Sequence, residues 1–232
     1  MKIKLVLSVV CCLFLVVTSN VYAISKEKLN NRIDRSNYFL EEMMEIPETS
    51  IPTTLLKSCQ GIIIMRQYKA GFIFGAKGGV GIALKRDIKT RKWSSPTFVA
   101  SGEASFGLQI GGQLSDAIIL IMNKSGVESL LLTKFKLGVG ASLAVGPVGR
   151  DTEAKIGPNT AYLVYSKAKG LYGGLIFEGG FISQDDGANK KFYGRKISVR
   201  EIFQNKDDVP NEAKALIKTL ERSEERRVGK EC

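Results

Sequence analysis

Apolar and polar residues alternate along several long segments of the sequence, and this alternation is its clearest structural signal. It runs through residues 97–111, 134–145 and 171–182. In the first segment, Phe98 and every second residue up to Ile110 are apolar or small, whereas the residues between them carry the polar groups. Successive side chains of a strand point to opposite faces of a sheet, so each segment predicts a strand with one buried side.

Two further runs, 61–68 and 115–123, are apolar at consecutive positions and predict buried strands, the second of them central in its sheet. Helical periodicity dominates near the ends of the chain. Leu29, Ile33 and Leu40 lie at three- and four-residue steps, which predicts an amphipathic helix over residues 25–46 with Ser25 as its N-cap. Acidic and basic residues mix on its polar face, which favours packing on its own domain over insertion into a membrane.

Shorter helical segments complete the pattern. Prolines at 47 and 52 end the first helix and begin a second helical piece that runs through residue 56. Residues 124–132 predict a short helix between strands. Residues 209–221, with a proline near the first turn, predict a closing helix.

Glycines recur inside the predicted strands, and one stretch is similar to a nucleotide site. Residues 77–81, KGGVG, match the opening of the phosphate-binding loop KGGVGK[ST] of some ATPases. That loop needs a lysine and a hydroxyl at the next two positions, where this sequence has Ile82 and Ala83. We therefore interpret the glycines as marks of bends and of close backbone approach. The predicted fold is α+β and mainly β: a strongly curved antiparallel sheet or barrel-like core, with an N-terminal amphipathic helix and a C-terminal helix.

Both ends of the sequence are set apart from this domain. Residues 1–23 combine a basic start, a short apolar run and compact residues before position 24, which is the pattern of a signal peptide. We therefore expect the mature chain to begin at Ile24 and to be exported, to the periplasm or the extracellular space. Residues 222–232 are charged, have no apolar face and end on an odd cysteine. We interpret them as a disordered or non-native tail and predict a single domain over residues 24–221.

Composition excludes several kinds of active site. The sequence contains no histidine, which removes Ser-His-Asp and Cys-His catalysis and every histidine-ligated metal site. Cys59 lies beside an apolar run, which favours a buried, inert thiol over a nucleophile. We expect no cofactor.

The charge balance points to anionic partners. The formal net charge is +11, and Lys2 and Lys4 of the expected signal peptide contribute to it. A basic exported protein favours partners such as phospholipid headgroups. Nucleic acid is a poor candidate, because the compartment is wrong and the sequence shows no interleaving of aromatic and basic residues.

Several strings, taken in their order and spacing, resemble one known domain. They are KAGFIFGAKGGVG, WSSPTFV, FGLQIGGQLSDAIILIMN, KFKLGVGASLAVGPVGRD, YSKAKGLYGGLIFEGG and NKKFYG. Together they are similar to the SYLF lipid-binding domain, which occurs in eukaryotic actin-patch and phosphoinositide-binding proteins and alone in exported bacterial proteins. The resemblance covers residues 29–220. It implies a phospholipid-binding module that is not an enzyme, with actin as a partner by family analogy only.

The resemblance also marks particular positions, most of them expected to set the fold. Those that match the family pattern are Gly71, Gly75, Trp93, Ser94, Pro96, Gly107, Gly111, Asp116, Gly146, Pro147, Gly149, Arg150, Gly170, Leu171, Gly174, Glu178, Gly179, Tyr193 and Gly194.

The candidate lipid-binding residues are the cations expected around the first hairpin. They are Lys57, Arg66, Lys69, Lys77, Lys85, Arg86, Lys89, Arg91 and Lys92. Each cation near an anionic bilayer contributes about 1 kcal/mol, so several together give salt-sensitive adhesion. Tyr68, Phe72 or Phe74 could insert at the interface beside them. A scattered, solvated surface with no dedicated partner is the open alternative.

The rival hypothesis is a carboxylate- or metal-dependent envelope enzyme. Paired carboxylates can act as acid and base or bind Ca²⁺. The candidates for that chemistry are Glu103, Asp116, Asp151, Glu153 and Glu178. The oxygen-rich loops lack the ordered ligand spacing of a calcium loop, so we predict no metal site.

Overall fold

The computed structural model describes residues 24–45, 50–71, 74–106, 111–137, 142–146, 160–168 and 180–225. Its helices are α2 Lys26–Glu45, α3 Thr53–Ser58, α4 Lys124–Ser129, α5 Asp186–Tyr193, α6 Val199–Gln204 and α7 Asn211–Glu225. Its strands are β1 Gly61–Gly71, β2 Phe74–Lys85, β3 Thr97–Phe106, β4 Gly111–Ile121, β5 Lys134–Lys136, β6 Ser142–Val145, β7 Thr160–Ala168 and β8 Phe181–Gln184. None of the helices in these ranges has both the length and the apolar composition needed to cross a bilayer. The expected signal peptide lies outside the described residues.

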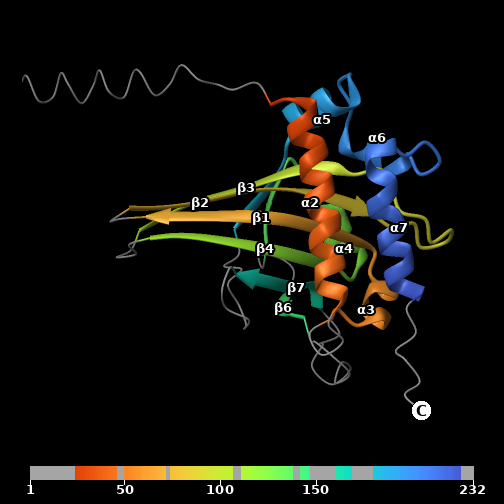
Figure 1. The fold of residues 1–232 in the computed structure, drawn as a ribbon, viewed down its shortest axis with the longest axis horizontal. Helices are drawn as coiled ribbons and strands as arrows, with labels where there is room; N and C mark the ends of the chain where they lie inside the picture. Colours follow the sequence, from red (N-terminus) through yellow and green to blue (C-terminus); the bar gives the residue numbers. More distant parts are fainter. Residues whose placement is uncertain are drawn as a thin grey trace, which may run out of the picture.

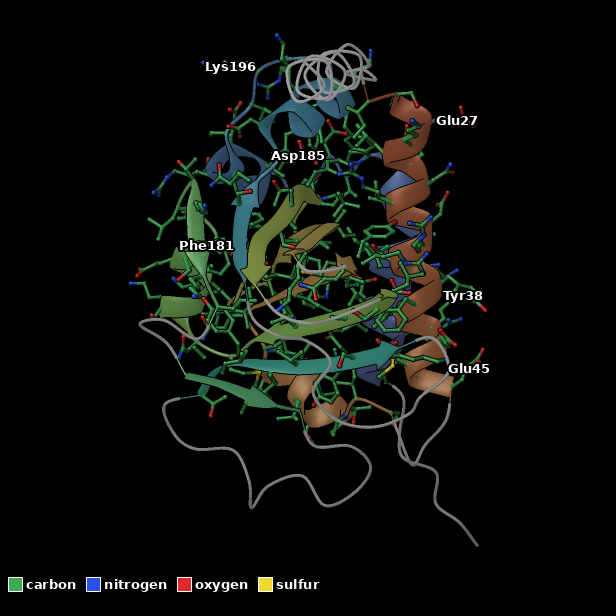
Figure 2. All side chains as sticks on the ribbon, turned by 90° about the vertical axis from the view of Figure 1, so that its left-hand side faces the viewer. Glu27, Tyr38, Glu45, Phe181, Asp185 and Lys196 are labelled. Atoms are coloured by element: carbon green, nitrogen blue, oxygen red, sulfur yellow. The ribbon has the colours of Figure 1, made fainter. Side chains whose placement is uncertain are left out.

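The described strands join one curved sheet in the order β5-β8-β3-β2-β1-β4-β7-β6. Neighbouring strands are antiparallel, except that β6 and β7 are parallel. Figure 1 shows the long strands β1 to β4 running across α2. Figure 2, turned to look along them, shows the sheet curling into a half-barrel with α2 on its convex side. The prediction of an α+β fold built on a strongly curved sheet is confirmed; the parallel pair was not predicted.

Apolar side chains are buried on both faces of the sheet. On the convex face, Ile62 and Ile64 of β1 belong to the same core as Leu29 of α2 and Leu216 of α7. On the concave face, Ile63 belongs to a second core, which residues of α4 and α6 complete. Both faces of β1 are therefore covered, which explains why its first half is apolar at consecutive positions.

The prediction that residues 97–111 bury only one side is wrong at the start of the segment. Phe98 is 0% exposed, and the next residue, Val99, is 2% exposed. Phe98 belongs to the core under the helices and Val99 to the core inside the curl. The sheet is covered twice at this end, so both faces of β3 avoid water there.

The single strand predicted over residues 134–145 is also wrong, because this segment forms two strands at opposite edges of the sheet. β5 pairs with β8, whereas β6 pairs with β7. An extended chain spans at most about 3.6 Å per residue, so the steps from Lys136 to Ser142 cover roughly 22 Å at most. The two edges must therefore approach each other, which requires the sheet to curl. Most of the strand predicted over 171–182 lies outside the described residues, and its end is β8.

The terminal helices follow the prediction with one change. Ser25 caps α2, since its Oγ accepts a hydrogen bond from the backbone N–H of Lys28 at 3.2 Å. The closing helix α7 continues to Glu225, so the domain boundary predicted after residue 221 falls inside it. Ser223 and Glu224 are buried. The predicted tail is thus helical as far as Glu225, and residues 226–232 lie outside the described part.

Residues 77–81 are a strand and form no phosphate loop. They lie within β2, which pairs with β1 on one side and with β3 on the other. An added Cβ at Gly81 would lie 2.4 Å from the carbonyl oxygen of Ile64, and one at Gly79 would lie 2.6 Å from Ser101 Oγ. These two glycines permit the close backbone approach that the curved sheet requires, as predicted.

Candidate functional site

The candidate lipid-binding cations lie at opposite ends of the hairpin of β1 and β2. Lys69 pairs with Lys77 near one end of this hairpin, whereas Gly61 pairs with Lys85 at the other. About 26 Å of extended strand separates positions 61 and 69, at roughly 3.3 Å per residue. At the Lys85 end, where α3 meets the connection between β2 and β3, lie Lys57, Lys85, Arg86, Lys89, Arg91 and Lys92. The single basic surface predicted from the sequence therefore does not form.

Arg86 is buried and joins distant elements of the fold. It is 3% exposed, and its guanidinium forms an ion pair with Glu224 of α7. It also donates to the carbonyl oxygens of Leu56 at 3.1 Å and Lys57 at 2.9 Å. Trp93 Nε1 donates to the other oxygen of Glu224 at 3.0 Å. Burial raises the pKa of Glu224, while the charge of Arg86 opposes that shift. Arg86 is therefore not available to a membrane, contrary to the sequence prediction.

Arg66 is also engaged within the molecule. Its guanidinium donates to both carboxylate oxygens of Asp116 on the neighbouring strand β4. The bond from Nε to Oδ1 is 2.6 Å long. Hydrogen bonding to Asp116 raises the pKa of Arg66. Asp116 is ion-paired with Arg66 through both oxygens, which disfavours a role as a free base or metal ligand. The rival enzyme hypothesis loses this candidate.

The connection between β2 and β3 is a short, well-braced turn. Asp87 Oδ1 accepts hydrogen bonds from the backbone N–H of Lys89 at 3.0 Å and of Thr90 at 2.7 Å. The other oxygen accepts from Lys206 Nζ at 2.5 Å. These donors, Lys206 foremost, hold the pKa of Asp87 well below its usual range. Arg91 completes the turn with a left-handed φ of 64°.

This turn presents a large apolar side chain among cations. Ile88 is 63% exposed, and Lys89, Arg91 and Lys92 are exposed beside it. The guanidinium of Arg91 donates to the carbonyl oxygen of Lys57, which brings the exposed Lys57 of α3 to the same place. Residues 87–92 together with Lys57 are called the basic turn below. Its surface combines positive charge with an exposed aliphatic group.

Ile88 was not among the residues predicted from the sequence to insert at the interface, which were aromatic and lie at the other end of the hairpin. Tyr68 is 49% exposed there, while Phe72 and the side chains of Lys69 and Phe74 lie outside the described part of the structure. The available signal was a single isoleucine within the charged string DIKTRK. A lone apolar residue in a charged turn has no core to join, so its exposure could have been expected.

Several residues of the family pattern meet between α5 and the segment that follows the basic turn. Tyr193 Oη donates to the carbonyl oxygen of Pro96 at 2.7 Å, and Ser94 Oγ accepts from the backbone N–H of Lys85 at 3.0 Å. Gly194 ends α5 with a φ of 70°, a conformation that favours glycine. Trp93, which is 1% exposed, joins the same segment to Glu224 of α7. These residues hold the turn to the rest of the domain.

The other residues of the family pattern are spread over the molecule. An added Cβ at Gly146 would lie 2.1 Å from the ring of Tyr165, so this glycine allows the two to pack. Gly71, Gly75 and Gly111 lie together at the far strand ends. Outside the described residues lie Gly107, Pro147, Gly149, Arg150, Gly170, Leu171, Gly174, Glu178 and Gly179.

The described residues contain no group of acidic or cysteine side chains arranged to hold a metal ion. Of the rival enzyme's remaining candidates, Glu103 lies on β3 and its side chain is not described; Asp151, Glu153 and Glu178 lie outside the described residues. Cys59 is buried as predicted, and burial raises its pKa to about 12, which suppresses the thiolate.

Known proteins similar to this chain share one family. A family model described as "Ysc84: Las17-binding protein actin regulator" matches residues 102–223. Protein YSC84 of Saccharomyces cerevisiae is 34% identical over 176 residues, which cover 74% of this chain and 37% of the yeast protein. SH3 domain-containing YSC84-like protein 1 of Xenopus laevis is 32% identical over 179 residues, or 75% of this chain and 53% of the frog protein. The chain thus spans about a third to a half of these relatives' length. No solved structure matches it.

Proposed function

This chain belongs to the Ysc84 family, whose shared segment is the SYLF domain, and from that premise we propose that it is a non-enzymatic module that binds anionic phospholipid surfaces. The basic turn is the contact surface. The observation that carries the proposal is Ile88, exposed at a turn that also exposes Lys89, Arg91 and Lys92. Headgroup phosphates attract the cations, and the aliphatic side chain enters the interface between them.

Charge contributes the larger part of this adhesion, and apolar area adds to it. Lys57, Lys89, Arg91 and Lys92 each add about 1 kcal/mol near an anionic bilayer. Moving the exposed part of Ile88 out of water adds roughly 1–2 kcal/mol. Lys92 pairs with Asp207 at 2.9 Å, but both side chains are largely exposed, so the pair is weak and can open. The sum, on the order of 5 kcal/mol, gives reversible and salt-sensitive binding.

Export is part of the same proposal. It rests on the signal-like pattern of residues 1–23. The anionic surface would then be the outer face of a membrane in the periplasm or extracellular space.

Vesicle co-sedimentation tests the proposal. We expect the protein to pellet with phosphatidylcholine vesicles that contain 30% phosphatidylglycerol, but not with pure phosphatidylcholine, and to dissociate at high salt. Lys89→Glu with Arg91→Glu should abolish pelleting, and Ile88→Ser should weaken it several-fold at unchanged charge. Lys190→Glu with Lys191→Glu, the same charge change on exposed residues of α5, is the control and should bind normally. Equal binding to both vesicle types, or equal loss in the control, would refute the proposal.

A second candidate function is actin regulation, which the description of the matching family model favours. If the chain itself contacts actin, it should co-sediment with filaments in the absence of lipid. If filaments pellet and this chain stays in the supernatant, actin binding is removed as a candidate and the lipid proposal is unaffected.

A further inference from the structure

The sheet extends beyond the helices that cover its convex face, and an apolar area remains open there. Figure 1 shows β1 to β4 continuing past α2 and α7 toward the strand tips. Alternation from Ile62 and Ile64 places Tyr68 on the convex face, and Tyr68 is 49% exposed. In register, Tyr68 stands between Gly78 of β2 and Leu114 of β4. Leu114 is only partly buried.

The glycines of this area are not required by the packing of the domain. Gly78 and Gly102 face each other across β2 and β3. An added Cβ at Gly102 would meet nothing within 4 Å, and one at Gly78 would meet only a carbonyl oxygen at 3.8 Å. Neither residue has a positive φ. Gly79 and Gly81, on the concave face, have no such room. Gly78 and Gly102 therefore keep the convex face flat where nothing in the described chain covers it.

Two arginines of α2 lie beside this open face. Arg32 and Arg35 line a small cavity with Arg66, where α2 meets the sheet. Arg32 pairs with Asp185 at 3.1 Å, and Arg66 pairs with Asp116. Arg35 is exposed, and no ion pair joins it to a carboxylate in the described part of the chain. Arg35 therefore leaves one net positive charge beside the apolar floor.

The length of β1 past the cavity is enough for one more helix. From Arg66 to the end of β1 at Gly71 the strand is about 17 Å long, at roughly 3.3 Å per residue. A helix with its side chains is about 10–12 Å wide. A helix laid beside α2 would continue the helical layer, with its apolar side on the floor and acidic residues against the arginines. A flat bilayer fits poorly, because α2 projects from the convex face of the sheet beside this area (Figure 2).

We propose that this open face, formed by Tyr68, Gly78, Gly102 and Leu114 and bordered by Arg32 and Arg35, binds an amphipathic helix with an acidic flank from a partner protein. Opposite charges select that helix, and the flat glycine pair lets its small residues approach the sheet closely. The surface is separate from the basic turn, so this proposal stands or falls independently of lipid binding.

A designed peptide pair tests it by fluorescence anisotropy. The probe is a labelled 18-residue helix with leucine and alanine on one side and glutamate along one flank; the comparison peptide carries lysine in place of glutamate. The wild-type protein should bind the glutamate peptide at least tenfold more tightly than the lysine peptide. Gly78→Val with Gly102→Val should weaken binding tenfold or more without lowering the melting temperature, because each Cβ has room and valine is favourable in a strand. Arg35→Glu should weaken it several-fold.

The controls distinguish a partner helix from a second copy of this chain and from lipid. Gly187→Val on α5, another glycine with room for a Cβ, should leave peptide binding unchanged. The proposal is overturned if the glutamate peptide shows no saturable binding, or if the Gly78 and Gly102 variant binds it normally. It is also overturned if light scattering shows a dimer that this variant dissociates, since the occupant is then a second copy. Loss of vesicle binding in this variant, with the basic turn intact, would assign the face to lipid instead.

Discussion

Glu224→Ala should destabilise the domain far more than the position of Glu224 near the end of the last helix suggests. The substitution leaves the guanidinium of Arg86 buried without its counter-ion and removes the acceptor of Trp93 Nε1. Removing one partner of a buried pair typically costs about 3–5 kcal/mol. Arg86 keeps three carbonyl oxygens as acceptors, at 3.1, 2.9 and 3.2 Å. We therefore expect a loss near the lower end of that range, about 3 kcal/mol.

Urea denaturation followed by tryptophan fluorescence measures this loss directly. Trp93 is the only tryptophan of the chain and is 1% exposed, so its emission reports the unfolding of this region. With a urea dependence of about 2 kcal/mol per molar, a loss of about 3 kcal/mol lowers the midpoint by roughly 1.5 M. Glu221→Ala, on the exposed side of the same helix, is the matched control and should change stability by less than about 0.5 kcal/mol.

A double variant decides whether the cost comes from the unpaired charge. Arg86→Met with Glu224→Leu removes both charges and fills the space with apolar atoms, so it should be more stable than either Arg86→Met or Glu224→Leu alone. A loss below about 1 kcal/mol in Glu224→Ala would refute the reasoning, as would a double variant whose loss equals the sum of the single losses.

Three further predictions concern local packing and charge. Gly146→Ala places a Cβ about 2.1 Å from the ring of Tyr165 and should cost about 1–3 kcal/mol in urea denaturation, whereas Gly102→Ala, which has open space, should not destabilise. Ser25→Ala removes the acceptor of the N–H of Lys28 and should cost about 1 kcal/mol, with the loss confined to α2 in hydrogen exchange. The pKa of Asp87 is held below its ordinary value of 3.8, so its stabilisation is present above that pH and is lost as the pH falls below it. Asp87→Asn should flatten the fall in melting temperature below about pH 4; an unchanged slope would contradict this assignment.

The elements with strong local periodicity could be predicted from the sequence. The helical spacing of Leu29, Ile33 and Leu40 predicted α2, and Ser25 was recognisable as its cap. Consecutive apolar residues predicted that β1 and β4 are buried. The absence of a lysine and a hydroxyl at positions 82 and 83 was enough to exclude a phosphate loop. Each of these signals depends on neighbours within about two turns or one strand.

The predictions that failed depended on pairing between distant parts of the chain. Alternation continues through residues 134–145, but it carries no information on partners, and β5 and β6 pair at opposite edges. Arg86 and Arg91 look alike in the sequence; Arg86 is buried because α7 brings Glu224 to it from 138 positions away.

Composition and local periodicity were therefore enough to predict the terminal helices, the buried strands β1 and β4, a curved β layer and the exclusion of histidine chemistry, whereas β7, α5 and α6 were not predicted. Only the tertiary structure decided which cations remain at the surface, that Ile88 stands among them, and which glycines leave a face open. The reason is physical. Whether a segment forms a helix or a strand depends largely on the pattern of residues near it in the sequence. The exposure of a side chain and its charge partners are set by residues that folding brings to it from elsewhere in the chain.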